Sequence, residues 1–82
     1  MNKREIKNSM VIKLDSIDKV KAFVHTVKDF DLSIDMTSGR YVIDAKSIMG
    51  IFSLDLSKPV VVVTYEDSEE SEAMFDSIAK FA

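Results

Sequence analysis

The sequence lacks cysteine and tryptophan altogether, and its 82 residues include only two glycines and one proline. Without cysteine the chain has no disulfide, no thiol nucleophile and no cysteine-based metal site, which fits a reducing cytoplasm. A single histidine cannot make a metal site, and the acidic residues show no calcium-loop spacing, so we expect no metal or other cofactor. So little glycine and proline leaves no room for a flexible linker, and we expect residues 1–82 to form a single domain.

Long hydrophobic runs and an excess of positive charge are missing as well. The uncharged runs fall far short of the roughly 20 residues that cross a bilayer, and Lys7, Asn8 and Lys13 interrupt any signal-peptide core. The formal net charge is −3, and there is no basic stripe or aromatic array that would bind bases. We therefore expect a soluble, cytoplasmic protein that binds neither membranes nor nucleic acid.

The first half of the chain alternates between strand and helix periodicity. Every second residue is apolar in a first predicted strand, apart from Asn8: Ile6, Met10, Ile12 and Leu14. A helix capped by Asp15 or Ser16 follows, and its apolar face comprises Ile17, Val20, Phe23, Val24 and Val27. Strict alternation over residues 30–36, a tight turn over residues 37–40 and a partner strand over residues 41–45 predict a hairpin. Gly39 is expected to adopt a positive φ in that turn.

The second half continues the pattern with a helix, a strand and a helix. Ser47 is placed to cap a helix over residues 48–56, which Pro59 ends. Residues 60–65 are the most β-prone segment, and Asp67 or Ser68 caps a last helix whose buried face comprises Met74, Phe75, Ile78 and Phe81. The order βαββαβα predicts an α+β fold: a two-layer open-faced sandwich with a four-stranded antiparallel sheet and three helices on one face.

The short helix after Ser47 is apolar nearly all round, which is unusual for a helix at the surface. On helical spacing, Ile51 and Leu54 share one face, and only one face can pack on the sheet. We expect the other face to form an exposed patch for a protein partner, in which methionine adapts to several partner shapes. The alternative is that all these side chains join an ordinary core. The predicted partner-binding residues are Ile48, Met49 and Phe52, with Lys46 beside them.

The segment "AKSIMGIFSL" at residues 45–54 resembles the stretch that carries the regulatory serine in HPr, the histidine-phosphorylatable carrier of the bacterial phosphotransferase system. The similarity runs without gaps from about Val20 through Pro59, and it includes "LSIDMTSGRYVIDAKS". The order βαββαβα is also that of the HPr family. The resemblance implies that the helix after Ser47 docks phosphotransferase components or a transcription regulator. It also implies that a serine kinase phosphorylates Ser47.

The resemblance breaks down where the family carries its phosphoryl group. There, a motif of glycine, histidine, arginine and proline follows the first strand, and its histidine accepts the phosphoryl group from Enzyme I. The matching stretch here is "KLDSIDKVKAF", which contains none of those four residue types. Asp15 and Asp18, on either side of Ser16, bring negative charge to the place where a phosphate would sit. We therefore expect a degenerate phosphoacceptor loop, no catalytic residue and no enzymatic activity.

Two residues have alternative interpretations. His25, the only histidine, is predicted within the first helix and away from its N-terminus, so we expect an exposed side chain rather than a phosphoacceptor. The Ser47 hydroxyl can cap its helix, which contributes about 0.5–2 kcal/mol. It can instead carry a phosphate at the positive end of the same helix.

The favoured function is a non-catalytic regulatory or interaction module linked to the phosphotransferase system. One alternative is a working phosphocarrier that uses another acceptor, such as His25. The other is a structural homodimer that buries the apolar helix.

Overall fold

The computed structural model describes residues 5–82 of the chain. Its four strands are β1 (Asn8–Ile12), β2 (Ile34–Ser38), β3 (Tyr41–Asp44) and β4 (Val60–Thr64). They form one sheet in the order β1-β4-β2-β3, and every neighbouring pair is antiparallel. The helices are α1 (Ile17–Val27), α2 (Ile48–Phe52) and α3 (Glu69–Ile78), and a 3₁₀ turn, η1 (Ala79–Phe81), follows α3. The predicted order βαββαβα is confirmed.

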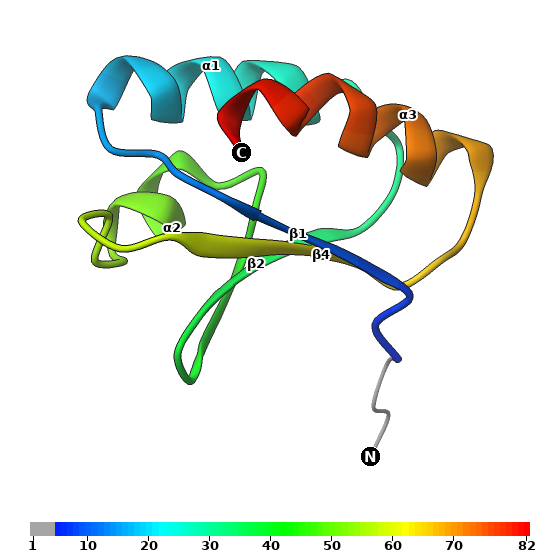
Figure 1. Cartoon of the computed structure of the whole chain (residues 1–82), viewed down its shortest axis with the longest axis horizontal. Coiled ribbons are helices and arrows are strands. Elements are labelled where there is room, and N and C mark those ends of the chain that lie inside the picture. The colour runs from blue at the N-terminus through cyan, green and yellow to red at the C-terminus, as the bar shows by residue number, and fades with distance from the viewer. Residues whose placement is uncertain (1–4) are drawn as a thin grey trace.

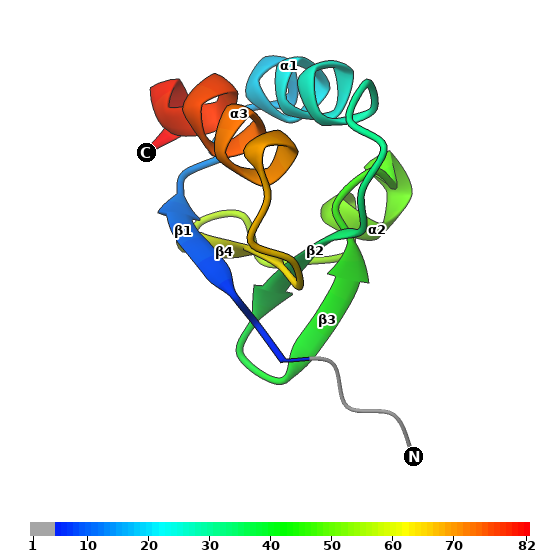
Figure 2. The ribbon, with the colours of Figure 1, turned by 90° about the vertical axis from the view of Figure 1, so that its right-hand side faces the viewer.

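The elements form two layers. In Figures 1 and 2, α1 and α3 run side by side over one face of the sheet, and α2 lies closer to the level of the sheet, next to α1 and β3. No helix of residues 5–82 covers the opposite face of the sheet. The predicted open-faced sandwich, with its antiparallel sheet and three helices on one face, is therefore confirmed.

Each of the three helices begins at a serine. Ser16, Ser47 and Ser68 have extended backbones, and each Oγ accepts a hydrogen bond from the backbone N–H three residues later, at 3.1 Å in all three cases. This geometry satisfies one of the four N–H groups that a helix start leaves without a partner. It also decides between the residues that the sequence offered as caps, because Ser16 caps α1 rather than Asp15, and Ser68 caps α3 rather than Asp67.

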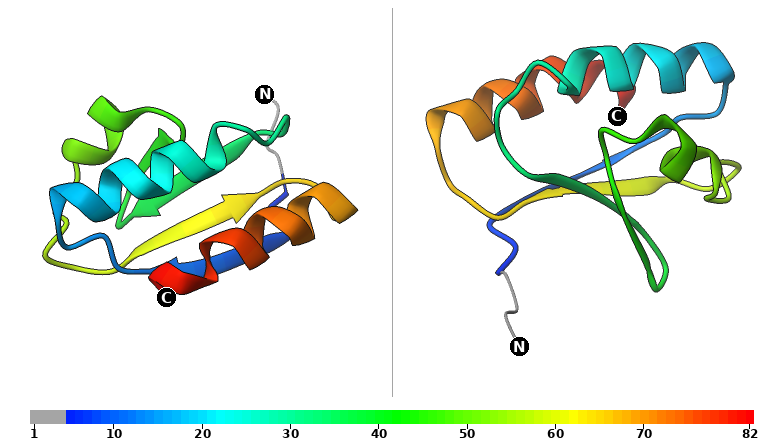
Figure 3. Two further views of the ribbon diagram at one scale, coloured as in Figure 1. Left: turned by 90° about the horizontal axis from the view of Figure 1, so that it is seen from above. Right: turned by 180° about the vertical axis from the view of Figure 1, so that it is seen from behind.

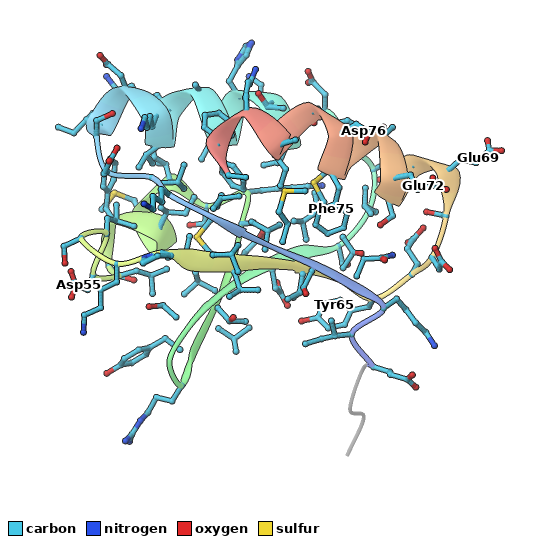
Figure 4. All side chains as sticks on the ribbon, in the orientation of Figure 1. Asp55, Tyr65, Glu69, Glu72, Phe75 and Asp76 are labelled. Atoms are coloured by element: carbon cyan, nitrogen blue, oxygen red, sulfur yellow. The ribbon has the colours of Figure 1, made fainter. Side chains whose placement is uncertain are left out.

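The core lies between the sheet and the helix layer. Alternate strand residues point into it, and Val20, Phe23 and Val27 of α1 meet them from above. The rings of Phe23 and Phe81 pack edge to face with centroids 5.9 Å apart, which joins α1 to the end of the chain. Phe75 was expected to be buried but is half-buried, beneath α3 in Figure 4. The remaining fully buried core side chains include Ile12, Leu14, Ile34, Met36, Ile51, Val60, Val62, Met74 and Ile78.

Two element boundaries differ by four residues from those predicted. The strand before the hairpin begins at Ile34 rather than Phe30, because the backbone before it bonds to side chains: Phe30 O accepts from Lys46 Nζ at 2.6 Å, and Asp31 N–H donates to Glu70 Oε2 at 2.6 Å. The helix predicted over residues 48–56 ends at Phe52.

The tight end of α2 explains its early stop. Ser53 N–H and Leu54 N–H each donate to the carbonyl three residues back, on Gly50 and Ile51, which is the 3₁₀ pattern that closes a helix. The hairpin turn forms as expected, with Gly39 at φ 60°. Among the helices of residues 5–82, none is both long and apolar enough to span a bilayer.

Candidate interaction site around α2

A sharp turn after β3 sets where α2 begins. Asp44 accepts two hydrogen bonds: its backbone oxygen from Ser47 N–H at 3.0 Å and its Oδ1 from Lys46 N–H at 2.9 Å. Ile51 N–H donates to Ser47 O at 3.0 Å, which continues the turn into helix. The start of this five-residue helix is therefore held by local hydrogen bonds rather than by its length.

Gly50 lets α2 lie close to β3 and to its own cap. A Cβ placed on Gly50 would come within 3.2 Å of Ser47 Oγ and 3.4 Å of Ile43 Cβ, and a contact of 3.2 Å would require the Ser47 hydroxyl to shift slightly. The glycine in "KSIMG" therefore has a structural reason: it leaves room for the capping hydroxyl and for β3.

The side chains of α2 divide into a buried set and an exposed pair. Ile51 is fully buried, whereas the exposed fraction is 76% for Met49 and 41% for Phe52. Ile48 is half-buried and packs against the core, so the expectation that it lies on the exposed face with Met49 and Phe52 is wrong. The reason is helical spacing: Ile48 and Ile51 are three residues apart and share a side of the helix. Leu54, expected to anchor α2 with Ile51, is also half-buried against the core.

Lys46 is tied into the fold. Its side chain is half-buried, and its ammonium donates to Phe30 O at 2.6 Å, in the segment that connects α1 to β2. This contact spans 16 residues of sequence and holds the entrance of α2 against the end of α1. The side chain predicted to flank a partner site thus also positions α2.

The start of α1 holds the residues predicted to be the degenerate phosphoacceptor loop. The structure brings Asp15, Ser16 and Asp18 together there, and all three are exposed. Asp15 Oδ1 lies 2.8 Å from Lys19 Nζ, and this hydrogen bond and the positive charge lower the pKa of the Asp15 carboxyl below its ordinary value of 3.8. Ser16 Oγ accepts from Lys19 N–H. A fixed carboxylate and a serine therefore occupy the N-terminus of this helix.

His25 lies at the other end of α1. It is exposed, as expected, and belongs to the last turn of the helix. Eight residues separate it from Ile17, so it lies about 12 Å along the helix from the N-terminal N–H groups. Within residues 5–82, no three His, Asp or Glu side chains cluster in a way that could hold a metal ion.

Ile17 is an exposed apolar residue that sequence reasoning placed on the buried face. Its exposed fraction is 61%, and it is the first residue of α1. Seen from above in Figure 3, α2 lies beside the first half of α1, so Ile17 belongs to the same end of the molecule as Met49 and Phe52. The exposure of Ile17 could have been expected from its position as the first residue of the helix, where a side chain can extend beyond the core.

Comparisons with known proteins point in one direction. A family model described as "PTS HPr component phosphorylation site" matches residues 18–82. The structure is similar to that of HPr-C-His from Thermoanaerobacter tengcongensis, with a TM-score of 0.72 and 26% identity, over 90% of this chain and 89% of that one. It is also similar in fold to a phosphocarrier protein HPr from Bacillus anthracis, with a TM-score of 0.70 and 24% identity, over 92% and 96% of the two chains. A search of curated protein sequences gave no match.

Proposed function

Because this chain belongs to the HPr family, the phosphocarrier family of the phosphotransferase system, we propose that it is a member without the phosphoacceptor histidine that regulates or docks other proteins. In this proposal it works in the cytoplasm and catalyses no reaction. Its contribution is a binding surface made by α2 and the start of α1. The candidate partners are phosphotransferase components, a serine kinase or a transcription regulator.

The observation that carries the proposal is the exposure of Met49 and Phe52 on a helix whose other side is anchored. Ile51 fixes α2 to the core, so the two exposed side chains are presented by a rigid base. Large apolar side chains exposed together at one site are typical of surfaces that bind proteins. Ile17 adds a third exposed apolar side chain from the neighbouring helix.

The start of α1 supports the loss of carrier chemistry. A phosphohistidine site needs a histidine with helix N–H groups and positive charge around it. Here the N–H of Lys19 is already bound by Ser16, and the side chain of Lys19 is paired with Asp15. Asp15, like any exposed aspartate, is ionised at neutral pH, and its charge opposes a phosphate.

Ser47 offers a means of regulation at the same surface. Its Oγ caps α2 in the unmodified chain, and a phosphate there would add nearly two negative charges two residues before Met49. Such a charge would weaken partners that need a dry apolar contact and attract partners that present arginine. The capping role and the regulatory role are compatible, because the first belongs to the unmodified serine.

The test is affinity capture from a lysate of the source cell, with bound proteins quantified for three baits. We expect wild type and the control Ala73→Asp, which changes an exposed residue of α3, to capture the same proteins. Met49→Asp/Phe52→Asp should lose at least one of them. Equal capture by all three baits would remove the proposed surface.

The family itself favours one alternative. The matching family model is described by its phosphorylation site, so a phosphocarrier that uses another acceptor is the second candidate function. His25 is the only histidine available to it. A carrier would take up a stoichiometric, acid-labile phosphoryl group, whereas the proposed module would not.

A further inference from the structure

The open face of the sheet carries a continuous row of β-branched side chains. The strand register places Val11, Val61, Thr37 and Val42 side by side across β1, β4, β2 and β3. Their neighbours along each strand, such as Ile12 and Met36, point into the core, so this row faces away from the helices. The exposed fractions are 57% for Val11 and 59% for Val42, at the two edges of the sheet.

Charges of opposite sign flank this row. On one side lies the row that contains Asp35 and Asp44, paired across β2 and β3. At the other end lie Lys13, which directly follows β1, and Arg40, in the hairpin turn. The open face thus has an acidic end, an apolar middle and a basic end.

The acidic end is structurally ordered. Tyr65 Oη donates to Asp35 Oδ2 at 2.6 Å, and Figure 4 shows Tyr65 on the side of the sheet away from the helices. Val63, which pairs with Asp35 and alternates with Tyr65, is buried even though it lies outside the main core. This part of the face therefore presents a fixed surface rather than loose side chains.

We propose that this open face binds a second copy of the chain, forming a symmetric dimer whose two-fold axis runs along the row Val11–Val42. Around this axis, each strand lies over the same strand of the other copy and runs in the opposite direction. Arg40 and Asp44 lie two residues before and after Val42, about 7 Å to either side of the axis. Arg40 of each copy therefore meets Asp44 of the other, and the β-branched rows stack on one another.

The other face-to-face arrangement is electrostatically poor. A two-fold axis parallel to the strands would bring Lys13 of one copy to Arg40 of the other. It would also place Asp44 opposite Ser9 and Asp35 opposite Val63, so that neither aspartate meets a positive charge. Like charges placed opposite each other across an interface are unfavourable. The charge pattern therefore selects one of the two symmetric arrangements.

The size of the face predicts a weak, reversible dimer. Strands about 4.8 Å apart, five residues long and rising about 3.4 Å per residue give a face of roughly 19 by 17 Å. Covering it in both copies encloses roughly 650 Å² of flat area, which places the contact among weak, transient associations rather than stable interfaces. We expect monomers at low micromolar concentration and dimers at several hundred micromolar.

The test is sedimentation equilibrium over that concentration range. Val42→Asp and Arg40→Asp should each raise the dissociation constant of the dimer at least tenfold. Because Arg40 lies in the exposed turn, Arg40→Asp should fold normally, and it tests the interface even if Val42→Asp does not fold. The double variant Arg40→Asp/Asp44→Arg should associate more strongly than Asp44→Arg alone, because it restores opposite charges across the interface. The comparison is matched, since both variants lack the Asp44 acceptor for Lys46 N–H.

A further variant separates this dimer from the proposed function. Met49→Asp/Phe52→Asp should dimerise like wild type, because α2 contributes no residue to the open-face row. A wild type that stays monomeric throughout, or a dimer that Val42→Asp leaves intact, overturns the inference. So does a dimer that depends on Met49 and Phe52, since that result would assign self-association to α2. The first two results leave the proposed function of α2 untouched, whereas the third would favour the homodimer alternative for that helix.

Discussion

At the scale of single residues, the serines that begin the helices show how far sequence reasoning reaches. A serine before an apolar helical pattern predicts a cap, and all three caps form. The choice between Ser16 and Asp15 was open, because both side chains can accept a backbone N–H. The structure gives the cap to Ser16 and pairs Asp15 with Lys19, a contact that depends on the side-chain conformations of both residues.

Removing the hydroxyl of Ser47 should cost stability. Ser47→Ala leaves Gly50 N–H without its side-chain acceptor, and we expect the free energy of unfolding to fall by about 1 kcal/mol. Ser47→Asp can still accept that hydrogen bond and should be nearly neutral. Urea denaturation measures both, with Ser16→Ala as the matched control because its cap has the same geometry. A Ser47→Ala variant as stable as wild type would contradict the capping role.

The Asp15–Lys19 pair predicts a pH dependence with a defined sign. Because the pKa of Asp15 is lowered below 3.8 in the folded chain, the pair stabilises the fold above about pH 4. That stabilisation is lost as the pH falls through the folded pKa. Both groups are exposed, so salt should weaken the effect.

An NMR titration of the carboxyl carbons checks this pair directly. Lys19→Gln should raise the pKa of Asp15 toward 3.8. Asp55 is the internal control, because hydrogen bonds from Ser57 lower its pKa and the substitution does not touch them. An unchanged Asp15 titration in Lys19→Gln would show that the pair does not form.

At the scale of elements, α2 separates what periodicity predicts from what packing decides. The apolar pattern predicted a helix with one anchored face and one exposed face, and Ile51 and Met49 are placed accordingly. The pattern did not predict the burial of Ile48 or the end of α2. The 3₁₀ hydrogen bonds of Ser53 and Leu54 close the helix early, and five residues are too few for a helical period to define its faces. The late start of the hairpin strand likewise depends on Lys46 and Glu70, which bond to the backbone before it from distant parts of the chain.

The two faces of α2 should respond differently to truncation. Ile51→Ala opens a cavity in the core and should lower the free energy of unfolding by about 2–5 kcal/mol. Met49→Ala changes a side chain exposed to water and should shift it by less than about 0.5 kcal/mol. Urea denaturation of the two variants tests the assignment. Similar losses would mean that Met49 packs into the core.

At the scale of the whole molecule, the element order and fold class follow from the sequence, because strand and helix periods alternate clearly along it. In the sheet order β1-β4-β2-β3, the first strand of the chain pairs with the last. The row of side chains across the open face therefore depends on the register between distant strands, which local periodicity does not encode. The combined result is a family fold with two exposed apolar side chains on α2 and with carboxylates and a serine at the start of α1.

The most direct test of this account is phosphoryl transfer to the whole chain. The protein is incubated with Enzyme I and phosphoenolpyruvate, and acid-labile phosphate is measured per chain, beside a family member that has the histidine motif. We predict that the control is labelled and that this chain takes up no stoichiometric phosphoryl group. Stoichiometric labelling that disappears in His25→Ala would contradict the account and identify the protein as a phosphocarrier with a relocated acceptor.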